Sequence, residues 1–254
     1  MSQSQATPIL QLKGISKAFG AVQALSDVEF KVYPREVVGL VGDNGAGKST
    51  LVKIVSGIFP TDSGEYLFEG QPVAVHGPRD VANLGIATVY QDLALCDNLD
   101  VVANLYLGRE EAGSGILREE AMERRAVDVL HDLSVTIPHV RTRVAALSGG
   151  QRQSVAVARS VMWNAKVVLL DEPTAALGVV QTRQVLNLIV KLREEGLGVV
   201  VISHNLADVF EVCDRIVVLR LGRRVGSFDV KGTNQQEIVA AITGAQFGQL
   251  RAEA

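Results

Sequence analysis

The chain has 254 residues, 47% of them hydrophobic, and a formal net charge of −3 at pH 7. This length allows one large domain or two small ones, and the hydrophobic content is sufficient for a sizeable core and too high for a disordered chain. The balance of 25 basic and 28 acidic residues argues against binding to nucleic acid by bulk electrostatic attraction, so no nucleic-acid partner is expected.

The cysteines and the apolar runs bear on the cellular setting. Cys96 and Cys213 stand singly in apolar surroundings, which favours buried thiols in a reducing cytosol over a disulfide or a metal site. No apolar run approaches the ~18 residues of a membrane span, and residues 1–7 lack the pattern of a secretory leader. We therefore expect a soluble protein that reaches any membrane through a partner.

Apolar periodicity predicts strands in the first third of the chain. Alternation of apolar and polar residues is typical of half-buried antiparallel strands, whereas a short continuous apolar run is typical of a fully buried strand. The predicted strands are residues 8–33 (an antiparallel set), 37–41, 65–69 and 72–75 (a hairpin around Gly70-Gln71), and 86–90.

A glycine-rich loop with the spacing G-x-x-x-x-G-K-S lies between the strand at 37–41 and an apolar helix at 51–55. In this context the glycines let backbone N–H groups point at phosphate oxygens, and the helix N-terminus adds its positive dipole end. Lys48 is expected to reach the β- and γ-phosphates of ATP, and Ser49 to offer its hydroxyl to Mg²⁺. The candidate nucleotide-binding residues here are Gly42, Asp43, Asn44, Gly45, Ala46, Gly47, Lys48, Ser49 and Thr50.

The pattern becomes helical from about residue 92 to 164, with a polar, glycine-containing loop at 108–115. Within 118–133, apolar residues recur at spacings of four, three and four, and the charged residues between them face solvent. From residue 166 onward strands and helices alternate, which is typical of a parallel sheet covered by helices. The predicted strands there are 166–170, 199–202 and 215–219, and the predicted helices are 179–195 and 205–212.

These elements predict an α/β fold in one domain covering residues 1–254. Residues 1–91 and 165–254 would form a P-loop NTPase core with an antiparallel β subdomain. Residues 92–164 would be an inserted α-helical subdomain.

Two carboxylates follow the apolar run Val167–Leu170. A buried strand that ends in acids places them at the carboxyl edge of a parallel sheet, where ligands bind. Asp171 fits the magnesium-holding carboxylate of a P-loop NTPase, and Glu172 would lie near the γ-phosphate, where it could orient or deprotonate the attacking water. An apolar run ending in Asp-Glu is a weak signal alone, and the phosphate loop earlier in the chain strengthens it.

The string Leu147-Ser148-Gly149-Gly150-Gln151 precedes a helical run. A serine that caps a helix is the simplest interpretation, but such a helix start can also bind phosphate. Because the string stands 20 residues before the Asp171 carboxylate, it resembles the signature motif of ATP-binding cassette (ABC) proteins. The resemblance implies that Ser148, Gly149, Gly150 and Gln151 bind the nucleotide.

The resemblance to the ABC family covers nearly the whole chain. Gln91, in Val-Tyr-Gln-Asp, matches the family's Q-loop glutamine; His204, in Val-Ile-Ser-His, matches its switch histidine; and Phe19 matches the aromatic that stacks on adenine. Carried over, the family pattern implies four catalytic residues and three magnesium-binding residues. The catalytic set is Glu172, His204, Gln91 and Lys48, and the metal set is Ser49, Gln91 and Asp171.

The stretches VYQDLALCDNLDVVANLYLGRE and SGGQRQSVAVARSVMWNAKVVLLDEPTAAL look like the ATPases of bacterial simple-sugar importers. The resemblance implies a peripheral protein at the cytoplasmic face of the inner membrane. Its partners would be membrane permease subunits and, through them, a periplasmic sugar-binding protein. Each ATP would lie between the phosphate loop of one subunit and the signature motif of the other, so a dimer, expected to be a homodimer, is implied.

Two points stay open. The solute could be an amino acid or a lipid, and an ABC ATPase acting on ribosomes or DNA is a rival from a different class. After Thr174 the family usually reads Ser-Ala-Leu-Asp, whereas this chain reads Ala175-Ala176-Leu177-Gly178. The family's aspartate, which crosses the dimer interface, is therefore glycine here, which puts the role of this loop in doubt.

Overall fold

A computed structural model describes residues 7–113 and 115–245. Its centre is a six-stranded sheet with the order β12-β11-β3-β10-β9-β6, parallel except for the antiparallel β11–β12 pair at one edge. The strands are β3 (Val37–Val41), β6 (Ile86–Val89), β9 (Val167–Asp171), β10 (Gly198–Ile202), β11 (Arg215–Arg220) and β12 (Arg223–Asp229). The predicted parallel sheet is confirmed, and β12 is an addition.

Both faces of this sheet are buried. Along β3, Val37 and Val41 pack into one hydrophobic cluster, whereas Val38 and Leu40 pack into another on the opposite face. Strands covered on both sides read as continuous apolar runs, which is why β3, β9 and β10 could be predicted from the sequence. The covering helices of the core are α1 (Lys48–Val55), α2 (Pro78–Asn83), α6 (Val179–Glu194), α7 (Leu206–Val212) and α8 (Gln235–Thr243).

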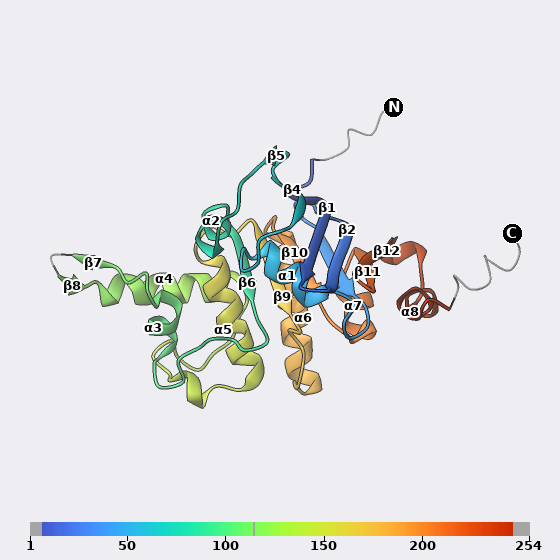
Figure 1. Cartoon of the computed structure of the whole chain (residues 1–254). Helices are drawn as coiled ribbons and strands as arrows, with labels where there is room; N and C mark the ends of the chain where they lie inside the picture. The colour runs from blue at the N-terminus through green and yellow to red at the C-terminus, as the bar shows by residue number, and fades with distance from the viewer. Residues whose placement is uncertain (1–6, 114, 246–254) are drawn as a thin grey trace, which may run out of the picture.

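A four-stranded sheet built largely from the N-terminal segment packs beside the core (Figure 1). Its order is β2-β1-β4-β5, and the pairs are antiparallel, as predicted. The strands are β1 (Leu10–Phe19), β2 (Val22–Val32), β4 (Ser63–Phe68) and β5 (Gln71–Pro72). The second strand of the expected hairpin is thus only two residues long.

Three helices form a lobe at the side of the molecule away from this sheet (Figure 1). They are α3 (Val101–Tyr106), α4 (Glu119–Asp132) and α5 (Gly149–Val161). The segment expected to be a loop at 108–115 instead contains β7 (Ala112–Gly113), which pairs with β8 (Ile116–Leu117) in a hairpin at the tip of the lobe. None of the helices in the described part of the chain is long and apolar enough to cross a membrane.

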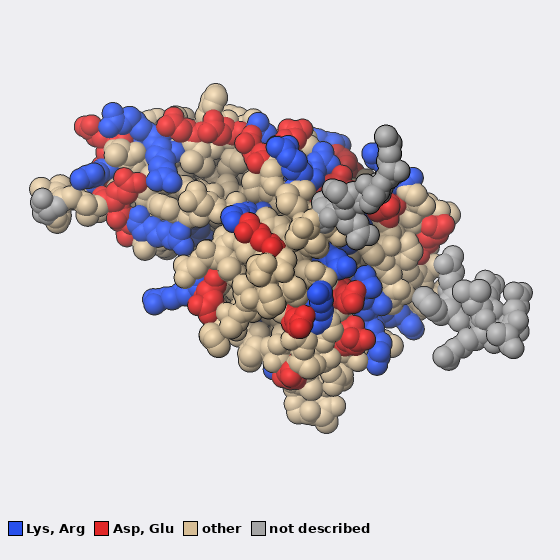
Figure 2. Space-filling view, turned by 90° about the horizontal axis from the view of Figure 1, so that it is seen from above, with Lys and Arg blue, Asp and Glu red and all other residues tan. Residues whose placement is uncertain are grey.

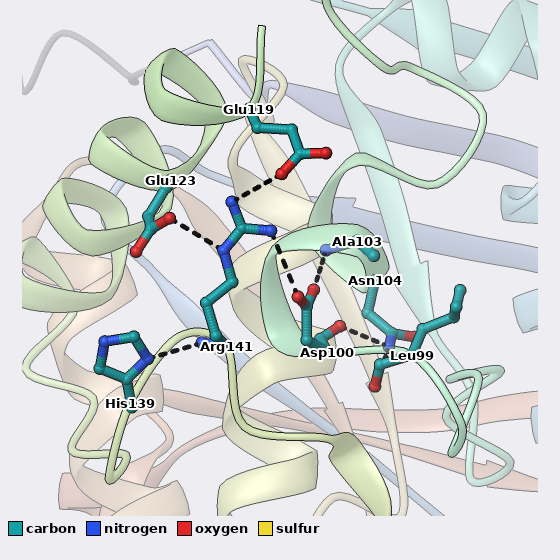
Figure 3. Close-up of polar contacts among 8 residues, drawn as sticks. All are labelled: Leu99, Asp100, Ala103, Asn104, Glu119, Glu123, His139 and Arg141. Carbon is teal, nitrogen blue, oxygen red and sulfur yellow. Dashed lines mark hydrogen bonds and ion pairs between the residues drawn. The ribbon is translucent and has the colours of Figure 1, made fainter. Parts of the chain in front are cut away.

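An arginine fastens the loop before α5 to the other helices of the lobe (Figure 3). Arg141 donates to Glu123 (2.8 Å) and Glu119 (3.3 Å) of α4, and to Asp100 (3.4 Å), which precedes α3. The second oxygen of Asp100 accepts from the Ala103 N–H (2.7 Å) and so caps α3. One guanidinium therefore ties two helices to the segment that leads into α5.

Basic and acidic side chains are interspersed over the face seen in Figure 2. No broad field of one sign covers that face, which agrees with the near-neutral composition of the chain. A surface of this kind provides little long-range attraction for a polyanion.

Candidate nucleotide-binding site

The predicted phosphate loop connects β3 to α1. Gly47, at the N-cap of α1, has φ 104°, and Gly42 has φ 155°. A Cβ at Gly42 would overlap the carbonyl oxygen of Leu219, and one at Gly47 would lie 2.6 Å from a methyl of Leu25. Glycine is therefore required at both positions by backbone conformation and by space.

The loop lines a hollow of about 310 Å³ with its backbone and with the side chain of Lys48. Lys48 Nζ donates to the carbonyl oxygens of Gly42 (2.7 Å) and Asp43 (3.1 Å), so the ammonium is held over the loop. Residues that the sequence motifs did not indicate also line the hollow: Val22, Gln23 and Ala24 of β2. These three residues belong to no sequence motif. They line the hollow because Ala24 lies close to Gly47 of the phosphate loop.

Phe19 lies at the end of β1, beside this region but outside the lining of the hollow. Its ring is 42% exposed and meets the ring of Phe59 edge to face, with centroids 5.2 Å apart. A partly exposed aromatic near a phosphate site has a free surface on which a base could stack.

Two carboxylates stand at the end of β9. Asp171 is its last residue, and burial together with the charge of Glu172 raises the pKa of Asp171, which the charges of Lys48 and Lys53 offset in part. Glu172 follows with φ 51°, in the left-handed region that few non-glycine residues adopt. Because β3, β10 and β9 are neighbouring parallel strands, the phosphate loop after β3 and the acids at the end of β9 lie at the same edge of the sheet.

His204 lies beside Glu172. His204 Nδ1 is 2.8 Å from Glu172 Oε2, and the Glu172 N–H donates to the carbonyl of Ile202 (2.9 Å) at the end of β10. The Glu172 side chain is 18% exposed, whereas that of His204 is 77% exposed. Adjacent parallel strands therefore bring two of the predicted catalytic groups into direct contact.

A second contact joins the same two segments. Thr174 Oγ1 donates to Asp208 Oδ2 (2.6 Å), and Asp208 is buried in the first turn of α7. The loop after Glu172 also contains Ala176 with φ 58°. Strained backbone persists only where its surroundings hold it, and the Thr174–Asp208 bond is one such restraint. The sequence motifs did not indicate Asp208.

Ser148 caps α5. Its Oγ accepts from the Gln151 N–H (3.3 Å), and the Gln151 side chain accepts from the Ser148 N–H (3.0 Å) in a capping box. Gly150 packs so tightly on α6 that a Cβ there would lie 2.9 Å from the Cβ of Gln181. The signature residues contribute nothing to the lining of the phosphate-loop hollow in this chain.

Gln91 follows β6 and is exposed. In the described ranges no hydrogen bond joins its side chain to Ser49 or to Asp171, the other predicted magnesium-binding residues.

Gly178 is the N-cap of α6, with φ −74° and ψ 166°. These angles are ordinary for any residue, so the backbone does not require glycine. The Gly178 N–H donates to Gln181 Oε1 (2.8 Å), which supplies one half of a capping box.

The parallel sheet, the phosphate loop after β3 and the paired acids after β9 define a nucleoside triphosphatase of the P-loop class. The chain belongs to the ABC transporter family, whose model matches residues 25–175. It is an ATPase of that family, with the expected β subdomain and helical insertion.

Relatives and solved structures agree with this assignment. A xylose/arabinose import ATP-binding protein of Sulfolobus acidocaldarius is 45% identical over 95% of this chain and 96% of its own length. A fructose import ATP-binding protein of Rhizobium meliloti is 46% identical over 94% and 95%. A ribose import ATP-binding protein of Yersinia pestis is 39% identical over 96% of this chain, which spans 48% of that relative.

A nucleotide-free ATP-binding cassette of an ABC transporter matches the fold with a TM-score of 0.80 at 27% identity, over 93% of this chain and 95% of the other. A dimeric bacterial ABC transporter cassette matches with a TM-score of 0.74 at 26% identity, over 88% and 100%.

Proposed function

We propose that this chain powers the import of a simple sugar by hydrolysing ATP beneath a membrane permease. The observation that carries the proposal is the pairing of Glu172 with His204 next to the phosphate loop, in a chain whose full-length relatives are named as import ATP-binding proteins for pentoses and fructose. The relatives supply the solute class, because an ATPase subunit has no contact with the sugar.

The residues of the hollow fit a magnesium-bound triphosphate. Two glycines keep side chains away from the loop backbone, Lys48 supplies a cation, and Asp171 is a half-buried carboxylate within reach of that charge. Bound Mg²⁺ would neutralise charge on the phosphate oxygens, and Ser49, Asp171 and Gln91 are the residues proposed to hold it.

The chain's own groups then divide the work of hydrolysis. Lys48 holds the β- and γ-phosphates in place, and Glu172 takes a proton from the attacking water. His204, at 2.8 Å from Glu172, is proposed to orient that carboxylate and to donate to the departing phosphate. Phe19 provides the surface on which adenine stacks.

Two subunits are needed in this proposal. The signature residues 148–151 lie outside the phosphate hollow of their own chain, so each would complete the site of a partner. The α5 N-terminus would then add backbone N–H groups to the γ-phosphate. A homodimer is the simplest assembly, and a dimeric cassette of similar fold supports it.

The permease is proposed to dock on a hollow of about 420 Å³ that lies between the segment after Gln91 and the helix α5. This position would pass closure of the dimer to the membrane partner. The proposed division into a core (1–91 and 165–254) and a helical subdomain (92–164) places the hollow at the boundary of the two. A periplasmic sugar-binding protein would deliver the solute, with this chain at the cytoplasmic face of the inner membrane.

Reconstitution tests the proposal. The chain is combined in proteoliposomes with the permease encoded beside it, the sugar-binding protein is added outside, and uptake of labelled ribose, xylose, arabinose and fructose is measured with ATP inside. We expect uptake of at least one sugar, and none with Lys48→Ala, whose lost charge no neighbour replaces. ATP hydrolysis that only an amino acid or a lipid stimulates would refute the sugar assignment while leaving the ATPase intact.

A further inference from the structure

The helix that carries the signature motif also holds the segment that follows Gln91. Arg159, on α5, donates from Nη1 to the carbonyl oxygen of Ala94 (2.8 Å) and from Nη2 to that of Leu93 (2.9 Å). The guanidinium is a planar fork of donors, so it can bind two successive carbonyls at once, which an ammonium cannot do equally well. The contact joins residues 65 and 66 positions apart in the chain.

The backbone that Arg159 holds is strained. Ala94 has φ 49°, in the left-handed region that an alanine adopts only at a cost. Its side chain is exposed, so packing around the methyl group does not enforce this conformation. Within residues 7–113 and 115–245, the other hydrogen bond made by Ala94 is a long one from its N–H to Asp92 Oδ1 (3.3 Å). The flanking Leu93 and Leu95 pack against the core, and the arginine is the side chain that acts directly on the two carbonyls of the turn.

The positive charge of Arg159 is not compensated by a carboxylate among the described residues. In the part of the chain that the structure describes, no carboxylate forms an ion pair with it, and burial lowers the pKa of its guanidinium. Placing a cation in such a position costs free energy unless its donors are used, and both bonds go to the turn after Gln91. The side chain also lines the 420 Å³ hollow between α5 and this turn.

We propose that Arg159 is a positioning residue for ATP hydrolysis. It holds the turn at Leu93–Ala94 in its left-handed form and so sets the position of Gln91. The inference rests on the role proposed for Gln91 in the ATPase site.

Three variants test it by steady-state ATP hydrolysis of the full chain with Mg²⁺. Arg159→Met keeps most of the unbranched apolar stem of the side chain and removes its donors; we expect kcat to fall about tenfold, equivalent to ~1.4 kcal/mol, with KM for ATP unchanged within about twofold. Arg159→Lys should lie between Arg159→Met and the wild type. Ala94→Val, with Arg159 intact, should reproduce the loss, because a β-branched residue resists the left-handed conformation and an exposed site tolerates it.

The decisive result is a rescue. Glycine adopts positive φ without a steric cost, so Ala94→Gly alone should be near wild type and should restore most of the kcat lost in Arg159→Met. A general loss of folding stability would not be restored in this way, and melting temperatures of all variants check that point. Wild-type kcat in Arg159→Met or Ala94→Val, or no rescue by Ala94→Gly, would overturn the proposal.

A double-mutant cycle separates this inference from the proposed function. If Arg159 acts through Gln91, then Arg159→Met should add little to the loss in Gln91→Ala. Full additivity of the two losses would overturn the coupling while leaving both residues important. If Gln91→Ala alone hydrolyses ATP at the wild-type rate, the assigned role of Gln91 fails, and the coupling fails with it, whereas Lys48→Ala and Glu172→Gln still test the ATPase site.

Discussion

Glu172 is the residue on which hydrolysis depends most in the proposed site. Glu172→Gln keeps the shape of the side chain and a hydrogen bond to His204, but the amide cannot accept a proton. We expect ATP binding to persist and kcat to fall by roughly a hundredfold or more. Single-turnover hydrolysis and nucleotide binding measure the two effects separately, and an ATP-bound dimer should accumulate in size-exclusion runs with Mg²⁺.

The matched control is Glu120→Gln, which removes one carboxylate from the exposed face of α4. It should hydrolyse ATP at the wild-type rate. If Glu172→Gln did so too, the proton would have to pass to another group, with Asp171 and His204 the neighbours able to accept it.

A substitution at Gly178 can distinguish a purely structural role of this position from a role at the dimer interface. Two outcomes can be expected when the family's aspartate is restored, namely stronger coupling between the sites or a strained loop. At the observed φ of −74° aspartate is a favoured N-cap residue, so we expect no backbone strain from the substitution. Its Cβ would lie 2.9 Å from Gln181 Oε1, at the end of a side chain that can move.

Gly178→Asp should therefore leave the melting temperature unchanged or slightly higher, by the few tenths of a kcal/mol that separate glycine from aspartate at an N-cap. If the carboxylate strengthens communication between two ATP sites, the Hill coefficient for ATP should rise. An unchanged Hill coefficient with unchanged stability would mean that this position is only the start of a helix.

At the scale of elements, Tyr66 connects the antiparallel sheet to the phosphate-loop helix. Its hydroxyl, on β4, donates to the carbonyl of Val55, the last residue of α1 (3.0 Å), and burial raises the pKa of Tyr66 well above its ordinary value. The folded chain thus keeps this proton at a pH where the unfolded chain loses it. Stability from this source is complete below the unfolded pKa of about 10 and declines as the pH rises above it.

Tyr66→Phe should cost about 1 kcal/mol at neutral pH, the typical value of one hydrogen bond. Because phenylalanine has no hydroxyl proton to lose, the free energy of unfolding of the variant should fall less steeply than that of the wild type above pH ~10. Urea titrations across this range measure both, and the slope between pH 7 and 9 is the internal control. Parallel curves above pH 10 would contradict the assignment.

Helices and strands with a strong local sequence pattern could be predicted from the sequence. Those that form through contacts with distant segments could not. The strand β3 is apolar throughout, and Ser148 directly precedes a helical run, so the strand and the helix start could be predicted; the capping box with Gln151 was not predicted. The strand β12 is largely exposed and begins with Arg223-Arg224, so no apolar alternation marks it, and it forms because β11 offers an edge.

The same distinction holds in the site. The phosphate loop and the Asp171-Glu172 pair have sequence motifs because their chemistry demands particular residues at fixed spacing. Arg159 acts on main-chain carbonyls, which every residue has, so no pairing pattern in the sequence indicates its partners. Asp208 lies four residues after His204, and only the fold brings it to Thr174.

For the whole molecule, a mixing experiment tests whether two chains share each site. Ser148→Arg should spare ATP binding by one chain and block closure, since a bulky cation would occupy the start of α5, and Lys48→Ala should be inactive alone. A mixed dimer has one site with both damaged halves and one intact site. At equal ratio, random pairing allows up to about a quarter of the wild-type rate. No recovery at any ratio would contradict independent shared sites.

The separation of residues 148–151 from the phosphate hollow of their own chain has a genetic consequence. A defective signature would damage a site that belongs jointly to two molecules. In a cell with equal doses of a wild-type and a Ser148→Arg allele, about half of the dimers would be mixed and only about a quarter wholly intact. If the shared sites act independently, each mixed dimer keeps one working site, and the cell retains about half of its sites, the same share as with an allele whose product never folds. Growth on the transported sugar that is poorer than with that null allele would therefore show that the two sites of a dimer must work together.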